Sequence, residues 1–217
     1  MELFGLNASP YVRKVLLVAA EKGLDLTLVP AGLLFDNADF TAISPFKKIP
    51  AFRDGDFSIC DSTAIITYLD AKYTQHPVLP AGPEDRARTI WFEEFADTIL
   101  TAAAGKIFFN RVVAKLVGRP GDMAAADAAE QADVPAALTY LDAQLTGREW
   151  LVGGALSLAD IAVFSPLMNL EICSGVIRDG RFPNVVAFVE RMLARPAIAG
   201  VMAAEKQAMA AMMNRAA

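Results

Sequence analysis

The residues of this sequence with the most definite chemistry lie around Pro50, where Lys48 and Ile49 precede a proline that opens a short apolar stretch. A peptide bond before proline can be cis at a cost of only about 0.5–1 kcal/mol. A cis Ile49–Pro50 bond at the start of a strand turns the N–H and C=O of Ile49 outward. An extended ligand can pair with such backbone groups as a short antiparallel strand. The sequence therefore predicts a backbone site for a small peptide at this position.

A second polar segment, Asp61-Ser62, follows a predicted strand and opens a predicted helix. The first N–H groups of a helix have no partner within it, so Ser62 can present its N–H and hydroxyl to an anion. The carboxylate of Asp61 can accept an ammonium group. A ligand that uses both segments carries an α-amino-carboxylate joined to a peptide. Glutathione, γ-Glu-Cys-Gly, is the common cellular molecule of that description.

A mixed sheet is expected to position these segments. The expected elements are, in order, a strand at 2–6, a helix from Ser9-Pro10 to Lys22, a strand at 26–29, a looser segment at 33–43, a hairpin with strands at 51–52 and 57–60, and a helix at 63–72. The strand–helix–strand order implies a parallel pair with a right-handed crossover. The turn Asp54-Gly55-Asp56 is a strong hairpin signal, which adds antiparallel pairing.

The chain is expected to divide at residues 74–83, where three prolines and a glycine mark a linker. This gives domains at 1–75 and 84–217. Helices in the second domain are expected from about 84 to 116, about 122 to 145, 157 to 173, 183 to 193 and 196 to 214. Ser157 and Asp160 form a capping box at the start of the most apolar of these helices, so we expect Asp160 to serve folding.

The run from Ser44 to Phe57, SPFKKIPAFRDGDF, followed by DSTAI at 61–65, resembles the cytosolic glutathione transferases, especially their theta-like and bacterial serine-type members. The resemblance is sharp before residue 75 and again near residue 157. It implies an N-terminal thioredoxin-like domain with a mixed four-stranded sheet and a C-terminal helical bundle domain. It also implies that glutathione is a co-substrate and that the protein is a homodimer.

The residue that activates the thiol is expected at the start of the first helix. The thiolate is the nucleophile in this chemistry, and a free thiol has a pKa of about 8.5. Ser9 precedes Pro10-Tyr11-Val12, where redox members of the fold carry Cys-Pro-Tyr-Cys, and both cysteines are absent here. The resemblance therefore implies serine-type activation by Ser9. Tyr11 and Asn7 stay open as alternatives, and Ser9 can also be an ordinary helix N-cap.

The resemblance also assigns the remaining glutathione contacts. It implies that Lys48, with Ile49 and Pro50, lies along the peptide and near its glycine carboxylate, that Lys47 can share this task, and that Asp61 and Ser62 bind the γ-glutamyl group.

Two further groups of residues are candidates in the helical domain. Glu93, Glu94 and Asp97 are candidates for a contact to glutathione from a partner subunit, although three acids on one helix also suit a solvated face or an ion pair at a dimer interface. Phe108 and Phe109, together with Tyr11 of the first domain, are candidates to line a pocket for an apolar electrophile.

Composition excludes several classes of protein. A chain of 217 residues with 54% hydrophobic residues can bury a real core. Its formal charge of −5 gives no general attraction to nucleic acid or anionic membranes. Cys60 and Cys173 stand alone and are expected to be buried inert thiols, and His76 is the single histidine, so no metal site is expected. The N-terminus lacks the pattern of a signal peptide, so we expect a cytoplasmic protein.

The sequence as a whole predicts a detoxifying transferase that joins the glutathione thiolate to small hydrophobic electrophiles. Two alternatives stay open. The same bound glutathione can serve a peroxidase or a reductive dehalogenase, or the fold can belong to a non-catalytic binding or regulatory protein. The physiological electrophile is not fixed by the sequence, because no specific motif marks the helical domain.

Overall fold

The computed structural model describes residues 1–216, with side chains described through Asn214. The chain forms two compact units. The first consists of Met1–Val78 and Ala197–Met209, and the second consists of Leu79–Pro196 and the residues from 210 onward. The chain thus crosses between the units inside the expected linker, while part of the last helix groups with the first unit.

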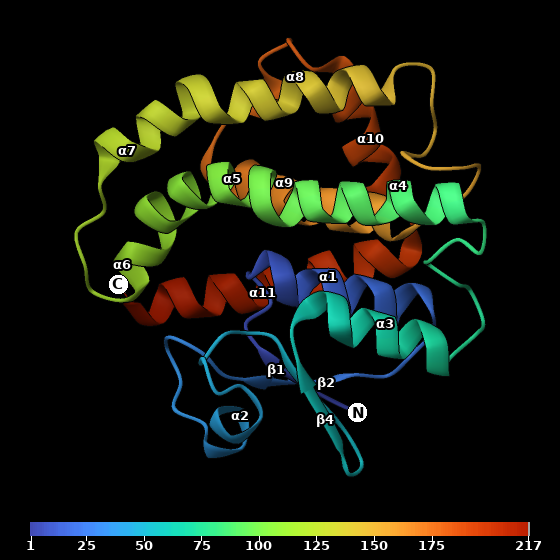
Figure 1. Ribbon diagram of the computed structural model, residues 1–217. Helices are drawn as coiled ribbons and strands as arrows, with labels where there is room; N and C mark the ends of the chain where they lie inside the picture. The colour runs from blue at the N-terminus through green and yellow to red at the C-terminus, as the bar shows by residue number, and fades with distance from the viewer. Residues whose placement is uncertain (217) are drawn as a thin grey trace. The chain divides into compact units, whose positions relative to one another are not determined.

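The first unit is built on a mixed four-stranded sheet, as the sequence predicted. The strands are β1 (Glu2–Gly5), β2 (Thr27–Pro30), β3 (Ala51–Asp54) and β4 (Phe57–Cys60), in the order β2-β1-β3-β4. β1 and β2 are parallel, and the other two pairs are antiparallel. The helices α1 (Pro10–Glu21) and α3 (Ser62–Lys72) pack together on one face, and α2 (Ala38–Ile43) lies on the other (Figure 1).

The short helix α2 was expected to be irregular chain, and this expectation was wrong. Asn37 caps it, because the side-chain oxygen of Asn37 accepts a hydrogen bond from the N–H of Phe40 at 3.0 Å. Asp39 in the first turn is favourable at the positive end of the helix dipole. Phe40 is buried against the sheet, which supplies the packing that so short a helix needs.

The second unit is entirely helical. One almost continuous helical run contains α4 (Pro83–Glu94), the π-helical η1 (Phe95–Leu100), α5 (Thr101–Phe108), the π-helical η2 (Phe109–Val113) and α6 (Ala114–Leu116). A second run contains α7 (Met123–Ala128), the π-helical η3 (Ala129–Asp133) and α8 (Val134–Leu145). The rest comprises α9 (Leu158–Cys173), the 3-10 turn η4 (Val176–Arg178), α10 (Pro183–Leu193) and α11 (Pro196–Ala216), of which α11 belongs in part to each unit.

The apolar helix α9 is the core of the second unit, as the sequence predicted. Every residue from Leu158 to Leu170 is buried, and α4 and α5 pack against it. The expected capping box is present: Asp160 accepts from the N–H of Ser157 at 2.9 Å and also from the N–H of Leu151 at 2.8 Å. Burial raises the pKa of the Asp160 carboxyl to about 6, although these donors oppose the shift.

No helix in the described chain is both long and apolar enough to cross a bilayer.

The acidic residues of the long helical run do not share one solvated face. Glu94 is exposed and Asp97 is half-buried, but Glu93 is completely buried. The expectation of a solvated face is therefore wrong for Glu93, because α4 packs against α9 and turns Phe92 and Glu93 inward.

The two cysteines are less buried than expected, since both are only half-buried. The thiol of Cys173 lies 3.0 Å from the carbonyl oxygen of Asn169, to which it donates. Burial raises the pKa of this thiol to about 11. Cys173 is therefore protonated at neutral pH, which agrees with an inert thiol.

Candidate functional site

The register of the sheet brings the predicted site segments to one edge. Gly5 at the end of β1 lies beside Pro30 at the end of β2. Phe4 lies opposite Ala51 at the start of β3, and Ala51 lies opposite Cys60 at the end of β4. The loops after β1, β2 and β4 and the loop before β3 therefore meet at this edge. They carry Ser9, Gly32, Asp61 and Ile49-Pro50.

Ile49 presents an unpaired stretch of backbone at this edge. The Ile49–Pro50 peptide bond is cis. Neither the N–H nor the C=O of Ile49 bonds to another group in the described part of the chain. Its side chain packs against the buried cluster of Phe4, Ala31, Phe40 and Ala51. Since an unpaired amide seeks a partner, this backbone suits pairing with an extended peptide.

Asp61 lies directly beside residues 44–50, here called the proline loop, because its N–H donates to the carbonyl oxygen of Pro50 at 3.3 Å. Its backbone has φ 83° and ψ 130°, a conformation that non-glycine residues rarely adopt. The carboxylate oxygen Oδ1 stabilises this conformation by accepting from the N–H groups of Thr63 and Ala64 at 2.9 and 3.0 Å. Strained residues of this kind cluster at functional sites.

Ser62 is the first residue of α3 and is 3% exposed. Its N–H donates to no backbone carbonyl among the described residues. A helix N-terminus attracts a carboxylate through its unpaired N–H groups and its dipole. Asp61 and Ser62 thus offer adjacent groups for an ammonium and for a carboxylate.

Ser9 occupies the N-cap position of α1, but its hydroxyl makes no capping hydrogen bond. Its backbone is fixed, because its N–H donates to the carbonyl oxygen of Leu6 and its C=O accepts from the N–H of Arg13, each at 2.9 Å. The half-buried hydroxyl is therefore held at the positive end of a helix without being used by it. The alternatives Asn7 and Tyr11 are also half-buried and lie on either side of Ser9.

Lys47 and Lys48 are both exposed and precede Ile49 directly. Lys47 has a positive φ of 54°, which is unusual for a residue with a side chain. The two ammonium groups give this end of the proline loop a positive charge that suits a carboxylate.

Two glycines that were not predicted as site residues leave room for neighbouring side chains, Gly32 for Ile49 and Gly5 for Val12. A Cβ atom on Gly32, where φ is +107°, would lie 3.1 Å from Cγ2 of Ile49. A Cβ atom on Gly5 would lie 2.5 Å from Cγ2 of Val12 and 3.5 Å from Cβ of Ile49. The sequence did carry a signal for these positions, because one glycine ends the first strand and another follows the second.

The predicted pocket residues of the helical unit differ in exposure. Phe108 at the end of α5 is buried, whereas Phe109 at the start of η2 is 42% exposed. Phe108 therefore contributes to the core of this unit, and Phe109 offers an aromatic ring to solvent.

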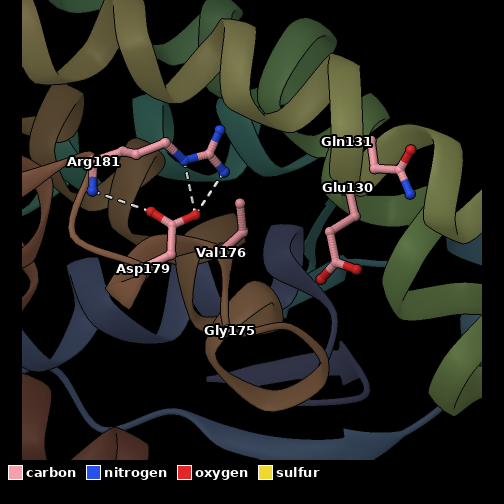
Figure 2. A pocket seen from close by; sticks show the side chains of 6 residues that line it. All are labelled: Glu130, Gln131, Gly175, Val176, Asp179 and Arg181. Carbon is pink, nitrogen blue, oxygen red and sulfur yellow. Dashed lines mark hydrogen bonds and ion pairs between the residues drawn. The ribbon is translucent and has the colours of Figure 1, made fainter.

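The second unit has an open depression of about 550 Å³, shown in Figure 2. Its lining residues are Glu130, Gln131, Gly175, Val176, Asp179 and Arg181. None of them was predicted as a site residue. Glu130 accepts from Arg111 and Ser174, and Asp179 accepts from Arg181. Both carboxylates of the depression therefore already have an arginine as ion-pair partner. Among the described residues, no group of three or more His, Cys, Asp and Glu side chains is arranged to hold a metal ion.

The fold and the edge of the sheet together define a thioredoxin-like domain joined to an all-helical domain, the architecture the sequence predicted. Models of the glutathione S-transferase N-terminal and C-terminal domains match residues 3–77 and 109–205. A glutathione S-transferase of Hyoscyamus muticus is 31% identical over 205 residues, which cover 91% of this chain and 95% of the relative. The chain belongs to the glutathione S-transferase family and is an enzyme of that transferase type.

Solved structures agree with this assignment. Glutathione S-transferase III in its apo form has a TM-score of 0.81 and 32% identity, with 94% of this chain and 95% of that chain covered. A theta-class enzyme of Xanthomonas axonopodis pv. citri, with glutathione bound, has a TM-score of 0.81 and 27% identity, with coverage of 93% and 96%. These comparisons confirm the family, the fold class and the enzyme class predicted from the sequence.

Proposed function

We propose that this protein binds glutathione at the edge of the sheet and transfers its thiol group to small hydrophobic electrophiles. The observation that carries the proposal is the unpaired backbone of Ile49 next to Asp61 and Ser62. A relative of the same fold is described with glutathione bound, which supports the choice of ligand.

Each part of glutathione has a partner in this proposal. The cysteine backbone pairs with the N–H and C=O of Ile49, beside Pro50. The γ-glutamyl ammonium binds the Asp61 carboxylate, and its carboxylate accepts from the N–H and hydroxyl of Ser62. The glycine carboxylate lies near the ammonium group of Lys48. A bound tripeptide held at four points is well positioned for reaction, which lowers the entropic part of the barrier.

We assign activation of the thiol to Ser9. Its hydroxyl is free of capping duty and lies at the N-terminus of α1, where the helix dipole also favours an anion. Lowering a thiol pKa by two units requires about 2.7 kcal/mol of preferential stabilisation of the thiolate. The sulfur then forms a bond with the electrophilic carbon, and the leaving group departs with the electron pair. We assign selectivity for apolar electrophiles to Tyr11, two residues after Ser9 on the same turn.

The chain has serine and valine, at Ser9 and Val12, where redox relatives of the fold have cysteines, which argues against mixed-disulfide chemistry at this turn. The enzyme therefore has no thiol at this turn to form a mixed disulfide with glutathione. Assays with hydroperoxides and with halogenated substrates separate conjugation from the peroxidase and dehalogenase alternatives. We place the reaction in the cytoplasm, where the two unpaired cysteines stay reduced.

Calorimetric titration of the whole protein with reduced glutathione tests the proposal. We expect saturable binding that weakens at least 10-fold in Asp61→Asn, a loss of about 1.4 kcal/mol. This variant removes the charge that binds the ammonium but keeps an amide oxygen to accept from Thr63 and Ala64. Asparagine also tolerates the positive φ at this position.

The matched control is Asp25→Asn, which removes an exposed carboxylate just before β2, at the opposite edge of the sheet. Its affinity should equal that of the unmodified protein. No binding by the folded protein would sink the transferase proposal and favour the non-catalytic alternative. Equal affinity in Asp61→Asn would instead remove only Asp61 from the ammonium site.

We also propose that the active form is a homodimer. Phe46, on the proline loop, is 83% exposed, and Trp91 and Ile99 of the helical unit are 51% and 47% exposed. A second copy of the chain would remove such apolar side chains from water. Sedimentation equilibrium should give about twice the chain mass of 23.3 kDa, and Phe46→Asp should shift the protein toward monomer. A monomeric unmodified protein would contradict the dimer, and a Phe46→Asp dimer of equal strength would exclude Phe46 from the interface.

A further inference from the structure

The side chain of the buried residue Ser44 closes the proline loop. Its hydroxyl donates to the carbonyl oxygen of Lys48 at 2.7 Å and accepts from the N–H of the same residue at 3.0 Å. The carbonyl oxygen of Ser44 also accepts from the N–H of Lys47 at 2.9 Å. Ser44 is only 1% exposed. Both backbone groups of Lys48 are therefore fixed by one hydroxyl.

The loop that Ser44 closes needs an external restraint. Lys47 has φ 54°, and a side-chain residue in such a region costs about 1–3 kcal/mol unless its surroundings hold it there. The four residues from Pro45 to Lys48 are exposed, so no packing on their own side chains provides that restraint. The two hydrogen bonds between the Ser44 hydroxyl and the backbone of Lys48, one donated and one accepted by the hydroxyl, do provide it.

The hydrogen bonds between Ser44 and Lys48 also restrain Ile49, the next residue in the chain. Ile49 is anchored on one side by its own side chain, which contacts the buried cluster and faces Gly32. On the other side its N–H belongs to the peptide group of Lys48, whose C=O is the acceptor of the Ser44 hydroxyl. The direction of the Ile49 N–H is therefore coupled directly to Ser44.

We propose that Ser44 is a positioning residue for glutathione, which orients the backbone of Lys48 and Ile49 without touching the ligand. This inference rests on the proposed function, since it concerns the peptide partner assigned to Ile49. Ser44 is thus expected to act on the affinity for glutathione and not on the chemical step.

The test compares Ser44→Ala with the unmodified protein by calorimetry and by steady-state kinetics with a chlorinated aromatic electrophile. We expect the Kd and the KM for glutathione to rise about 10-fold, while kcat at saturating glutathione stays within about twofold. A purely structural role would lower the thermal midpoint and leave Kd and KM unchanged in the folded protein.

The matched control is Thr41→Val. The Thr41 hydroxyl also donates to a backbone carbonyl, that of Asn37 at 3.0 Å, but it is exposed and its bond lies within α2 and not in the loop. Its Kd and KM should not change. If Ser44→Ala does not fold, Ser44→Cys keeps a group of similar size with weaker hydrogen bonding, and it should also weaken binding.

Two failures are distinguishable. If the unmodified protein does not bind glutathione, the proposed function itself fails. If the unmodified protein binds and a folded Ser44 variant binds equally well, the proposed function stands and Ser44 is not a positioning residue.

Discussion

Replacing Ser9 with alanine is expected to lower the rate of conjugation near pH 6.5 by about 10- to 100-fold. A hydrogen bond to a charged group contributes about 1.5–3 kcal/mol, and this one is assigned to the thiolate of glutathione. Removal of the donor destabilises the anion, so the pKa of the bound thiol rises by about 1–2 units. The loss of rate should therefore shrink as the pH rises, because above the new pKa both proteins hold the thiolate. The measurement is kcat at saturating glutathione from pH 6 to 9.

The shape of the pH profile separates activation from simple positioning. A deficit of equal size at every pH would mean that Ser9 orients the sulfur without changing its pKa. Tyr11→Phe and Asn7→Ala are the matched controls, since each removes a neighbouring polar group from the same turn. We expect both to leave the apparent pKa unchanged. A raised pKa in either of them, with an unchanged Ser9→Ala, would transfer the role to that residue.

The sequence predicted the parts of the fold that depend on local signals. The hairpin at Asp54-Gly55-Asp56 and the capping box of Ser157 and Asp160 need only neighbouring residues, and both are present. The edge of the sheet was also predictable, because strand order and direction decide which loops meet there. The predicted segments around Ile49 and Asp61 do lie side by side in the structure, joined by the hydrogen bond from Asp61 to Pro50.

What the sequence did not predict depends on which groups a side chain reaches. Ser44 and Pro45 look like an ordinary turn, and nothing local indicates that the hydroxyl of Ser44 binds both backbone groups of Lys48. Glu93 is adjacent to the exposed Glu94, and only the packing of α4 on α9 decides that one is buried. Helix α2 was missed because its cap, Asn37, stands in a segment without apolar periodicity.

The ion pair of Arg13 and Glu205 is the clearest interaction that the sequence could not predict, because the two residues are 192 positions apart. Arg13 lies on α1 and Glu205 on α11, both within the first unit. Nε and Nη2 of Arg13 donate to the two carboxylate oxygens at 2.6 and 2.5 Å. The side chains are 0% and 2% exposed. This two-pronged geometry fixes both charges in a place from which water is excluded.

Removal of Glu205 alone should therefore destabilise the protein strongly. Glu205→Leu leaves the Arg13 cation buried without its carboxylate, which costs about 3–5 kcal/mol for pairs of this kind. Typical domains have only about 5–15 kcal/mol of stability, so the variant should unfold at much lower urea concentration. Arg13→Met should show a loss of similar size, measured by urea unfolding followed by circular dichroism. Asp39→Asn is the control, since it breaks a solvent-exposed pair with Arg53 and should cost far less stability.

The double variant Arg13→Met with Glu205→Leu shows how much the ion pair contributes to the free energy of unfolding. Two apolar side chains of similar volume leave no buried charge, so the double variant should recover much of the loss seen in each single variant. If the loss of stability in the double variant equalled the sum of the losses in the two single variants, the charges would not interact, contrary to the distances between them. Strong recovery would mean that the pair selects how α11 docks on α1 more than it adds net stability. Because α1 begins beside Ser9, that selection would also fix the helix whose N-terminus is assigned to the thiolate.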